Sequence, residues 1–71
     1  MNNERMSTQR YFSVMDGDTE VAKATLLTSA ANEWNGDRRN RVVNQVKPNG
    51  DGSWTVIRQV TTDELLGALI G

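Results

Sequence analysis

The chain contains neither cysteine nor histidine. Without these residues it can form no disulfide, and no zinc site of the common thiolate and imidazole type. The side chains most often used as nucleophile and general base are also missing. No pattern of Ser, Lys, Tyr or carboxylate residues takes their place. We therefore expect a protein that is not an enzyme and needs no metal or cofactor.

Long apolar runs are absent as well. No segment approaches the roughly 18 apolar residues of a membrane-spanning helix. The first ten residues, MNNERMSTQR, lack the apolar segment of a secretory signal. We expect a cytoplasmic protein that does not contact a membrane.

The chain is also short. With 71 residues it is near the lower size limit of a stable fold. A core of this size rarely supplies more than about 3–5 kcal/mol, and there are no disulfides or zinc to add to it. We expect a flexible arm over residues 1–9 and a single small α+β domain over 10–71. Such a domain has little room for a pocket, so no small-molecule substrate is implied. Association with itself, as a homodimer, or with another protein is the expected support.

Neither sign of charge dominates, since eight Lys and Arg stand against nine Asp and Glu. Proteins that act mainly by neutralising phosphates are usually basic, so the balance argues against general nucleic-acid binding. One local basic cluster remains, formed by Arg38, Arg39 and Arg41 with Asn40 among them. Guanidinium groups bind phosphates and carboxylates well. This cluster is a candidate site for nucleic acid or for an acidic protein surface.

The clearest structural signal is the segment Arg41–Val60, RVVNQVKPNGDGSWTVIRQV. Two runs with a period of two flank a cluster of turn residues, which predicts a β-hairpin. The alternation predicts that Val43 and Ile57 lie on one face of the hairpin. The opposite, buried face is predicted to comprise Val42, Val46, Trp54, Val56 and Val60.

The glycine-containing turn of this hairpin, Asn49–Ser53, does not fit either familiar ligand loop. A phosphate-binding loop is followed by a helix, whereas this turn is followed by a predicted strand. A calcium loop requires glycine at its sixth position and glutamate at its twelfth, where this chain has Trp54 and Val60. We expect a plain turn.

The segment Thr19–Trp34 has two interpretations. Apolar residues spaced by three or four favour one long helix, with Asp18 as its N-cap. Alternatively, Thr19–Leu26 is a strand that forms a hairpin with the preceding segment, and a shorter helix covers Thr28–Trp34. The long helix is the favoured prediction, and the second interpretation stays open.

The remaining segments complete the predicted fold. Arg10–Met15 alternates as a short strand. Thr61 and Glu64 have the spacing of a capping box before the apolar run LLGALI, which predicts a C-terminal helix. The predicted order is β-α-β-β-α. It gives a three-stranded, mostly antiparallel sheet with one main helix on a face and a short C-terminal helix.

These expectations favour a protein that acts through its surface. We expect a small protein–protein interaction module, an inhibitor or adaptor, that is homodimeric. In size and composition it is similar to small accessory proteins of bacteria and bacteriophages. The alternative is a nucleic-acid-binding or transcription-regulating protein that uses the arginine cluster. Apolar interface candidates are Val43, Ile57, Leu65, Leu66, Leu69 and Ile70.

Overall fold

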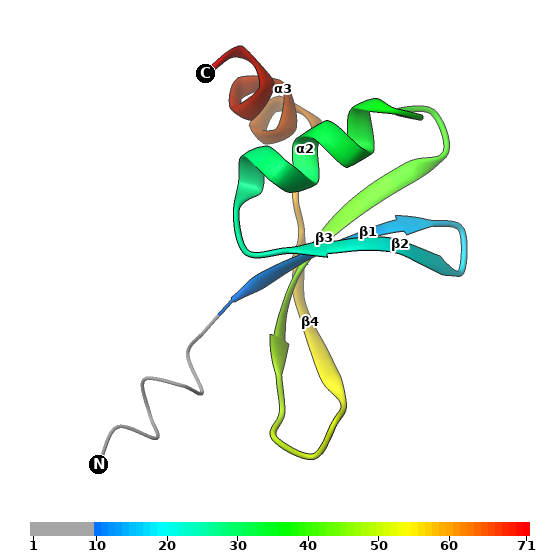
Figure 1. The fold of residues 1–71 in the computed structure, drawn as a ribbon, viewed down its shortest axis with the longest axis vertical. Helices are drawn as coiled ribbons and strands as arrows, with labels where there is room; N and C mark the ends of the chain where they lie inside the picture. Colours follow the sequence, from blue (N-terminus) through cyan, green and yellow to red (C-terminus); the bar gives the residue numbers. More distant parts are fainter. Residues whose placement is uncertain (1–9) are drawn as a thin grey trace.

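Four strands and two helices form the part of the chain that the computed structural model describes, residues 10–71 (Figure 1). The predicted flexible arm over residues 1–9 lies outside the described residues. In chain order the elements are β1 (Tyr11–Asp16), β2 (Thr19–Ala24), α2 (Leu27–Asn35), β3 (Arg41–Pro48), β4 (Trp54–Gln59) and α3 (Thr62–Ile70).

The strands form one sheet in the order β2-β1-β3-β4, with every neighbouring pair antiparallel. The predicted α+β class with two helices and an antiparallel sheet is confirmed. The predicted strand number and element order are wrong, because the described residues form four strands in the order β-β-α-β-β-α.

The difference lies in the segment that had two interpretations. The favoured helix over Thr19–Trp34 is wrong, and the competing hairpin is correct in outline. Asp18 is a turn residue and not a helix cap. Gly17 precedes it with φ 62°, a backbone conformation that favours glycine, and the two residues join β1 to β2.

A β-bulge explains why β2 does not show the sequence pattern of a strand. The pairing of β2 with β1 shifts between Val14 and Met15, which leaves Val21 as the extra residue. As a result Glu20 and Lys23, three positions apart, both line the same side of the sheet. The apolar spacing that favoured one long helix therefore combines this interrupted strand with the true helix α2.

Both helices lie on one side of the sheet, where they complete the core (Figure 1). Helix α2 packs on β1, β2 and β3, and α3 packs beside α2. Each helix has nine residues, and no helix within residues 10–71 is long and apolar enough to cross a membrane. The buried core residues are Val14, Ala30, Ala31, Trp34, Val43, Val60 and Leu65.

The start of α3 confirms the predicted capping box. The Glu64 backbone N–H donates to Thr61 Oγ1 at 3.2 Å, and Glu64 Oε1 accepts from the Thr61 backbone N–H at 2.9 Å. Arg58 of β4 donates to both Glu64 carboxylate oxygens, each at 2.9 Å. Chiefly through the Arg58 hydrogen bonds, and also through those from Thr61, the pKa of Glu64 is lowered to about 2.

The predicted hairpin of β3 and β4 is present, but its two faces are assigned wrongly. Val46 pairs with Val56 and Gln45 pairs with Arg58, so Ile57 is the extra residue of a second bulge. This bulge moves the residues of β4 on its two sides to opposite faces of the sheet. Of the predicted buried face, only Val60 belongs to the core cluster beneath the helices.

Two predicted interface residues, Val43 and Leu65, are corrected because they are buried. Val43 has none of its surface exposed and Leu65 has 2%, because both contribute to the core beneath the helices. Leu66 and Leu69 are partly buried against that core. Ile70 remains 88% exposed at the end of α3.

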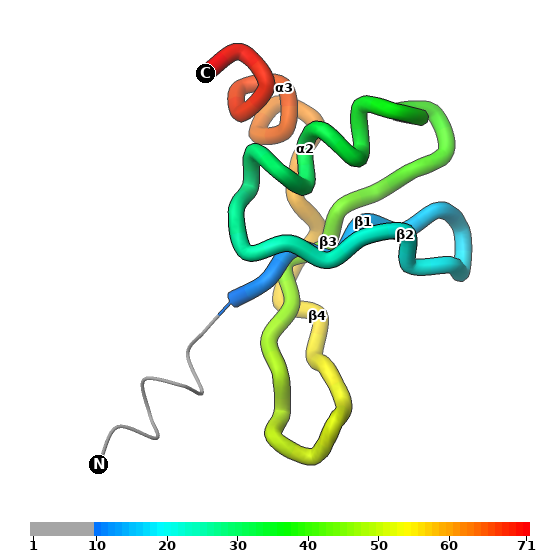
Figure 2. The backbone as a smooth tube through the Cα atoms, viewed as in Figure 1, coloured from blue at the N-terminus to red at the C-terminus, as the bar shows by residue number. Residues whose placement is uncertain are grey.

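The sheet is strongly twisted. The tube in Figure 2 shows the outer half of the β3–β4 hairpin extending away from the helices, in a different direction from the β1–β2 hairpin. The side of the sheet facing away from α2 and α3, which we call the open face, is therefore curved. Neither α2 nor α3 covers it (Figure 1).

Candidate functional site on the open face of the sheet

The open face contains a hollow of about 370 Å³. This volume lies within the range of roughly 300–1,000 Å³ found for small ligand sites. The hollow is larger than expected for so short a chain, while the expectation that no small-molecule substrate is bound stays a prediction. The hollow is lined by Ser13, Met15, Glu20, Lys23, Asn44, Val46, Trp54 and Val56.

Trp54 forms one wall of the hollow. Its ring stands edge to face with that of Tyr11, with centroids 5.2 Å apart and the ring planes at 89°. Such aromatic pairs contribute about 0.5–1.5 kcal/mol beyond the area they bury. Trp54 nevertheless remains 40% exposed, so the prediction that it belongs to the core is wrong. The other tryptophan, Trp34, is buried in the core beneath the helices.

A series of polar contacts crosses the hollow from β2, the outer strand on the other edge of the sheet. Lys23 Nζ lies 3.6 Å from the centroid of the Trp54 ring and 3.6 Å from Glu20 Oε2. The same Glu20 oxygen accepts a hydrogen bond from the Ser13 hydroxyl. Lys23 belongs to β2 and Trp54 to β4, the two outer strands of the sheet. The cation–π contact therefore links the two edges across the curved face.

Ser13, Glu20 and Lys23 resemble parts of a catalytic set only superficially. No imidazole is present to accept the Ser13 proton, and the Glu20 carboxylate is paired with an ammonium group. Strand β1 lies between β2 and β3, so its backbone N–H groups are engaged in the sheet and are not directed at a ligand. We interpret the three residues as a link that holds β1 and β2 in place.

Asn44 brings a free amide group to the hollow. Within residues 10–71 its side chain forms no hydrogen bond. An amide of this kind has two donor hydrogens and an acceptor oxygen. The group can therefore bind a ligand without breaking a contact of the fold.

Both outer strands of the sheet carry a bulge. The extra residue is Val21 in β2 and Ile57 in β4. Bulges at sheet edges hinder the addition of a further strand. The arrangement favours contact through the open face over contact through an edge.

The predicted basic cluster does not form a single surface. Arg41 is directed inward, where its Nη1 donates to the Glu33 carbonyl at 2.6 Å and its Nε lies 3.7 Å from Asp16 Oδ2. The Asn40 amide donates to both carboxylate oxygens of Asp37, at 3.0 and 3.2 Å. These two residues of the cluster therefore stabilise the connection between α2 and β3.

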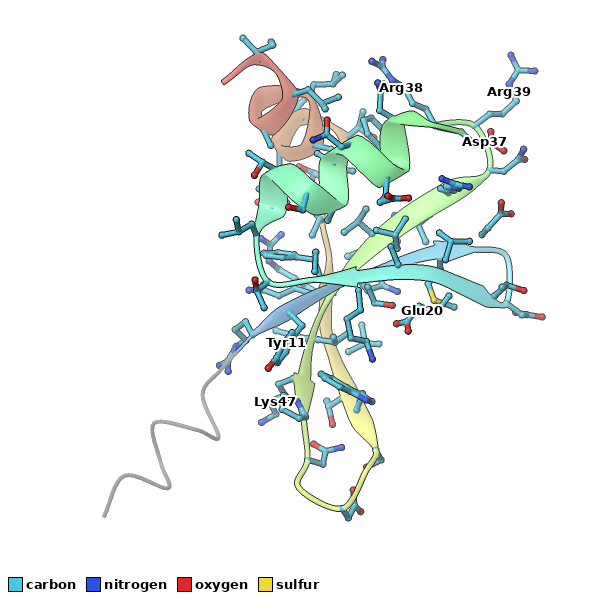
Figure 3. The ribbon with its side chains drawn as sticks, viewed as in Figure 1. Tyr11, Glu20, Asp37, Arg38, Arg39 and Lys47 are labelled. Carbon is cyan, nitrogen blue, oxygen red and sulfur yellow. The ribbon has the colours of Figure 1, made fainter. Side chains whose placement is uncertain are left out.

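The other two arginines are exposed at the end of α2. Arg38 Nε donates to Asn35 Oδ1 at 2.6 Å, and its guanidinium carbon lies 5.3 Å from the Trp34 ring centroid. Figure 3 shows Arg38 and Arg39 directed away from the sheet, on the opposite side from Glu20. The basic cluster and the hollow are thus separate regions of the molecule.

Most residues of the hollow were not among the sequence candidates. A signal for part of it was present, because the alternation of Arg10–Met15 places Tyr11, Ser13 and Met15 on one face. The face of Glu20 and Lys23 could not be predicted in the same way. The bulge at Val21 breaks the alternation of β2, so that these two residues, three positions apart, lie on the same face.

Comparisons with known protein families, with curated proteins and with solved structures gave no match to this chain. Any function assigned to the hollow therefore rests on the geometry described above.

Proposed function

We propose that this protein is a non-enzymatic binding module that holds a partner protein against the open face of its sheet. The single observation that carries the proposal is the unequal covering of the sheet. Both helices lie on one side, while the other side leaves Trp54 40% and Val56 58% exposed around a hollow. Exposed aromatic and aliphatic side chains grouped on one surface are typical of protein interfaces. As such a module, the chain would act by covering a surface of its partner, as an inhibitor, or by joining two partners, as an adaptor.

The distribution of charge supports a protein partner over nucleic acid. Lys23 in the hollow is paired with Glu20, and Arg58 is paired with Glu64. Arg38 and Arg39 lie on the far side of the molecule (Figure 3). A strand of nucleic acid placed on the open face would therefore meet few cations that are free to neutralise its phosphates.

Site-directed photocrosslinking in cells that produce the protein tests this proposal. A photoreactive benzoylphenylalanine replaces Val56 at the rim of the hollow, and the matched control carries it at the exposed Thr28 of α2. We expect an adduct with another protein from position 56 and none from position 28. Trp54→Ala should weaken the adduct at least tenfold, as expected for a central aromatic anchor.

Three outcomes would contradict the proposal. The absence of any adduct from position 56 would show that the open face meets no protein. An adduct removed by nuclease, or by replacing Arg38 and Arg39 with Ala, would support the nucleic-acid alternative. An adduct of about twice the chain mass of 7.9 kDa would instead support the predicted homodimer.

A further inference from the structure

We propose that the hollow receives an uncharged aliphatic side chain from an extended segment of the partner, and that Asn44 binds the peptide group beside that side chain. The inference rests on the proposed function and names the ligand class of the same site. Volume, charge, the Asn44 amide and the shape of the sheet edges support it.

The volume and the lining favour an aliphatic side chain. At about 370 Å³ the hollow is near the lower limit of small ligand sites, so it suits one or two side chains better than a large molecule. Met15, Val46, Val56 and the Trp54 ring supply its apolar surface. Methionine is flexible enough to adapt to guests of somewhat different shape.

The charges of the hollow cancel. Lys23 Nζ is 3.6 Å from Glu20 Oε2, and Glu20 also accepts the Ser13 hydrogen bond. A charged guest would have to leave water and would find both possible counter-ions already paired. An uncharged side chain requires no such exchange.

Asn44 points to a peptide group as the second part of the ligand. Its amide lines the hollow and makes no hydrogen bond within residues 10–71. A side-chain amide can donate to a peptide carbonyl and accept from a peptide N–H at the same time. An aliphatic side chain in the hollow would bring its own backbone within reach of this group.

The bulges determine how the segment approaches. Val21 and Ile57 interrupt the two outer strands, which hinders a guest strand from extending either edge in regular register. The segment is therefore expected to lie across the curved open face, with Trp54 beside its inserted side chain.

Nuclear magnetic resonance of the ¹⁵N-labelled full chain tests the ligand class directly. The probe is N-acetyl-leucine N-methylamide, which combines one aliphatic side chain with two peptide groups. We expect saturable shifts of the Trp54 indole N–H and of the Asn44 side-chain N–H signals, with half-saturation in the millimolar range. The indole signal of Trp34, buried in the core, is the internal control and should not move.

Three comparison probes define specificity. N-acetyl-glycine N-methylamide lacks the side chain and should bind about tenfold more weakly, because it buries no aliphatic surface. The corresponding lysine and aspartate amides should bind at least as weakly as the glycine amide. Equal binding of the glycine and leucine amides, or no shift of the Trp54 and Asn44 signals with the leucine amide, would overturn the inference.

Variants separate the two parts of the site. Asn44→Ala should weaken binding of the leucine amide about fivefold, as expected for the loss of one net hydrogen bond. The matched control Gln59→Ala changes the residue paired with Asn44 in the sheet, does not line the hollow, and should have no effect. Val56→Asp at the exposed rim should weaken binding at least tenfold without disturbing the core. Unchanged binding in both Asn44→Ala and Val56→Asp would overturn the inference.

The same spectra distinguish this inference from its alternatives. If the Trp54 and Asn44 signals move on dilution without probe, a second copy of the chain fills the hollow, and the inference is wrong. If position 56 crosslinks to a partner protein but the leucine amide does not bind, the proposed function stands and only the ligand class fails. If the amide binds but no protein is crosslinked, the proposed function fails instead.

Discussion

Val43 and Val46 are identical residues three positions apart on β3, yet they lie on opposite faces of the sheet. Val43 packs in the core beneath α2 and α3, whereas Val46 lines the hollow of the open face. Both side chains are buried, but only the first is enclosed by helices. The comparison shows that one strand serves stability on one side and a candidate binding surface on the other.

The difference has a simple physical origin. The two helices of the described residues have nine residues each, and both are used to cover the same side of the sheet. Among residues 10–71, the other side is closed only by contacts between its own side chains, such as Trp54 with Tyr11 and Lys23. Stability should therefore depend mainly on the helix-covered face, and binding on the open face.

The largest expected contrast lies between the two tryptophans. Trp34→Ala removes a large side chain from the core and should cost about 3–5 kcal/mol, close to the whole stability of so small a domain. Trp54→Ala loses the Tyr11 and Lys23 contacts of a half-exposed ring and should cost about 1–2 kcal/mol. Urea denaturation followed by circular dichroism measures both free energies of unfolding. Equal costs would show that the open face is as tightly closed as the core.

The valine pair sharpens the same comparison with a smaller change. Val43→Ala should cost about 2 kcal/mol, because it leaves a cavity enclosed by the helices. Val46→Ala should cost about 1 kcal/mol, since the enlarged hollow remains open to water. The measurement is again the urea concentration at the midpoint of unfolding, compared between variants whose unfolding free energy depends equally steeply on urea. A larger loss for Val46→Ala would reverse the assignment of the two faces.

The smallest effect concerns the cap of α3, which helps to hold this helix on the covered side. The folded chain keeps the pKa of Glu64 at about 2, below the ordinary value of 4.5. The unfolded chain therefore binds more protons between these values. The Glu64 contribution is fully present above about pH 4.5 and is lost as the pH falls through about 2.

Denaturation of the chain and of Glu64→Gln across this range measures the effect. We expect the unsubstituted protein to be more stable than Glu64→Gln near pH 6, and the difference in unfolding free energy to shrink toward pH 2. Thr61→Ala should cost about 1 kcal/mol, the usual value of a helix N-cap. A difference between the chain and Glu64→Gln that does not change with pH would contradict the role of the ionised carboxylate.

Much of the fold could be predicted from local sequence. The turn residues of Asn49–Ser53 and the alternation around them identified the β3–β4 hairpin, and Thr61 with Glu64 identified the start of α3. These signals are local, because turn and cap residues act through the backbone of their immediate neighbours. The bulges at Val21 and Ile57 are not local in this sense. They depend on pairing between strands. The bulge at Val21 obscured which residues of β2 share a face, and the bulge at Ile57 reversed the predicted faces of part of β4.

The site was much harder to predict. Its central contact joins Lys23 to Trp54, which lie on the two outer strands and meet only because the sheet is curved. Arg41 and Asn40 appeared as binding candidates because their residue types suit phosphate or carboxylate. In the fold they bind the Glu33 carbonyl and Asp37 instead. Residue type alone does not distinguish a structural guanidinium from a binding one.

The sequence by itself determined the β3–β4 turn, the cap of α3, the small size of the core and the absence of thiol and imidazole chemistry. Only the tertiary structure decided which face of the sheet α2 and α3 cover, and hence that Val43 belongs to the core while Trp54 is exposed. The reason is that alternation along a strand separates two faces but does not say which one is buried. That choice depends on where the helices pack and on the single extra residue in each outer strand.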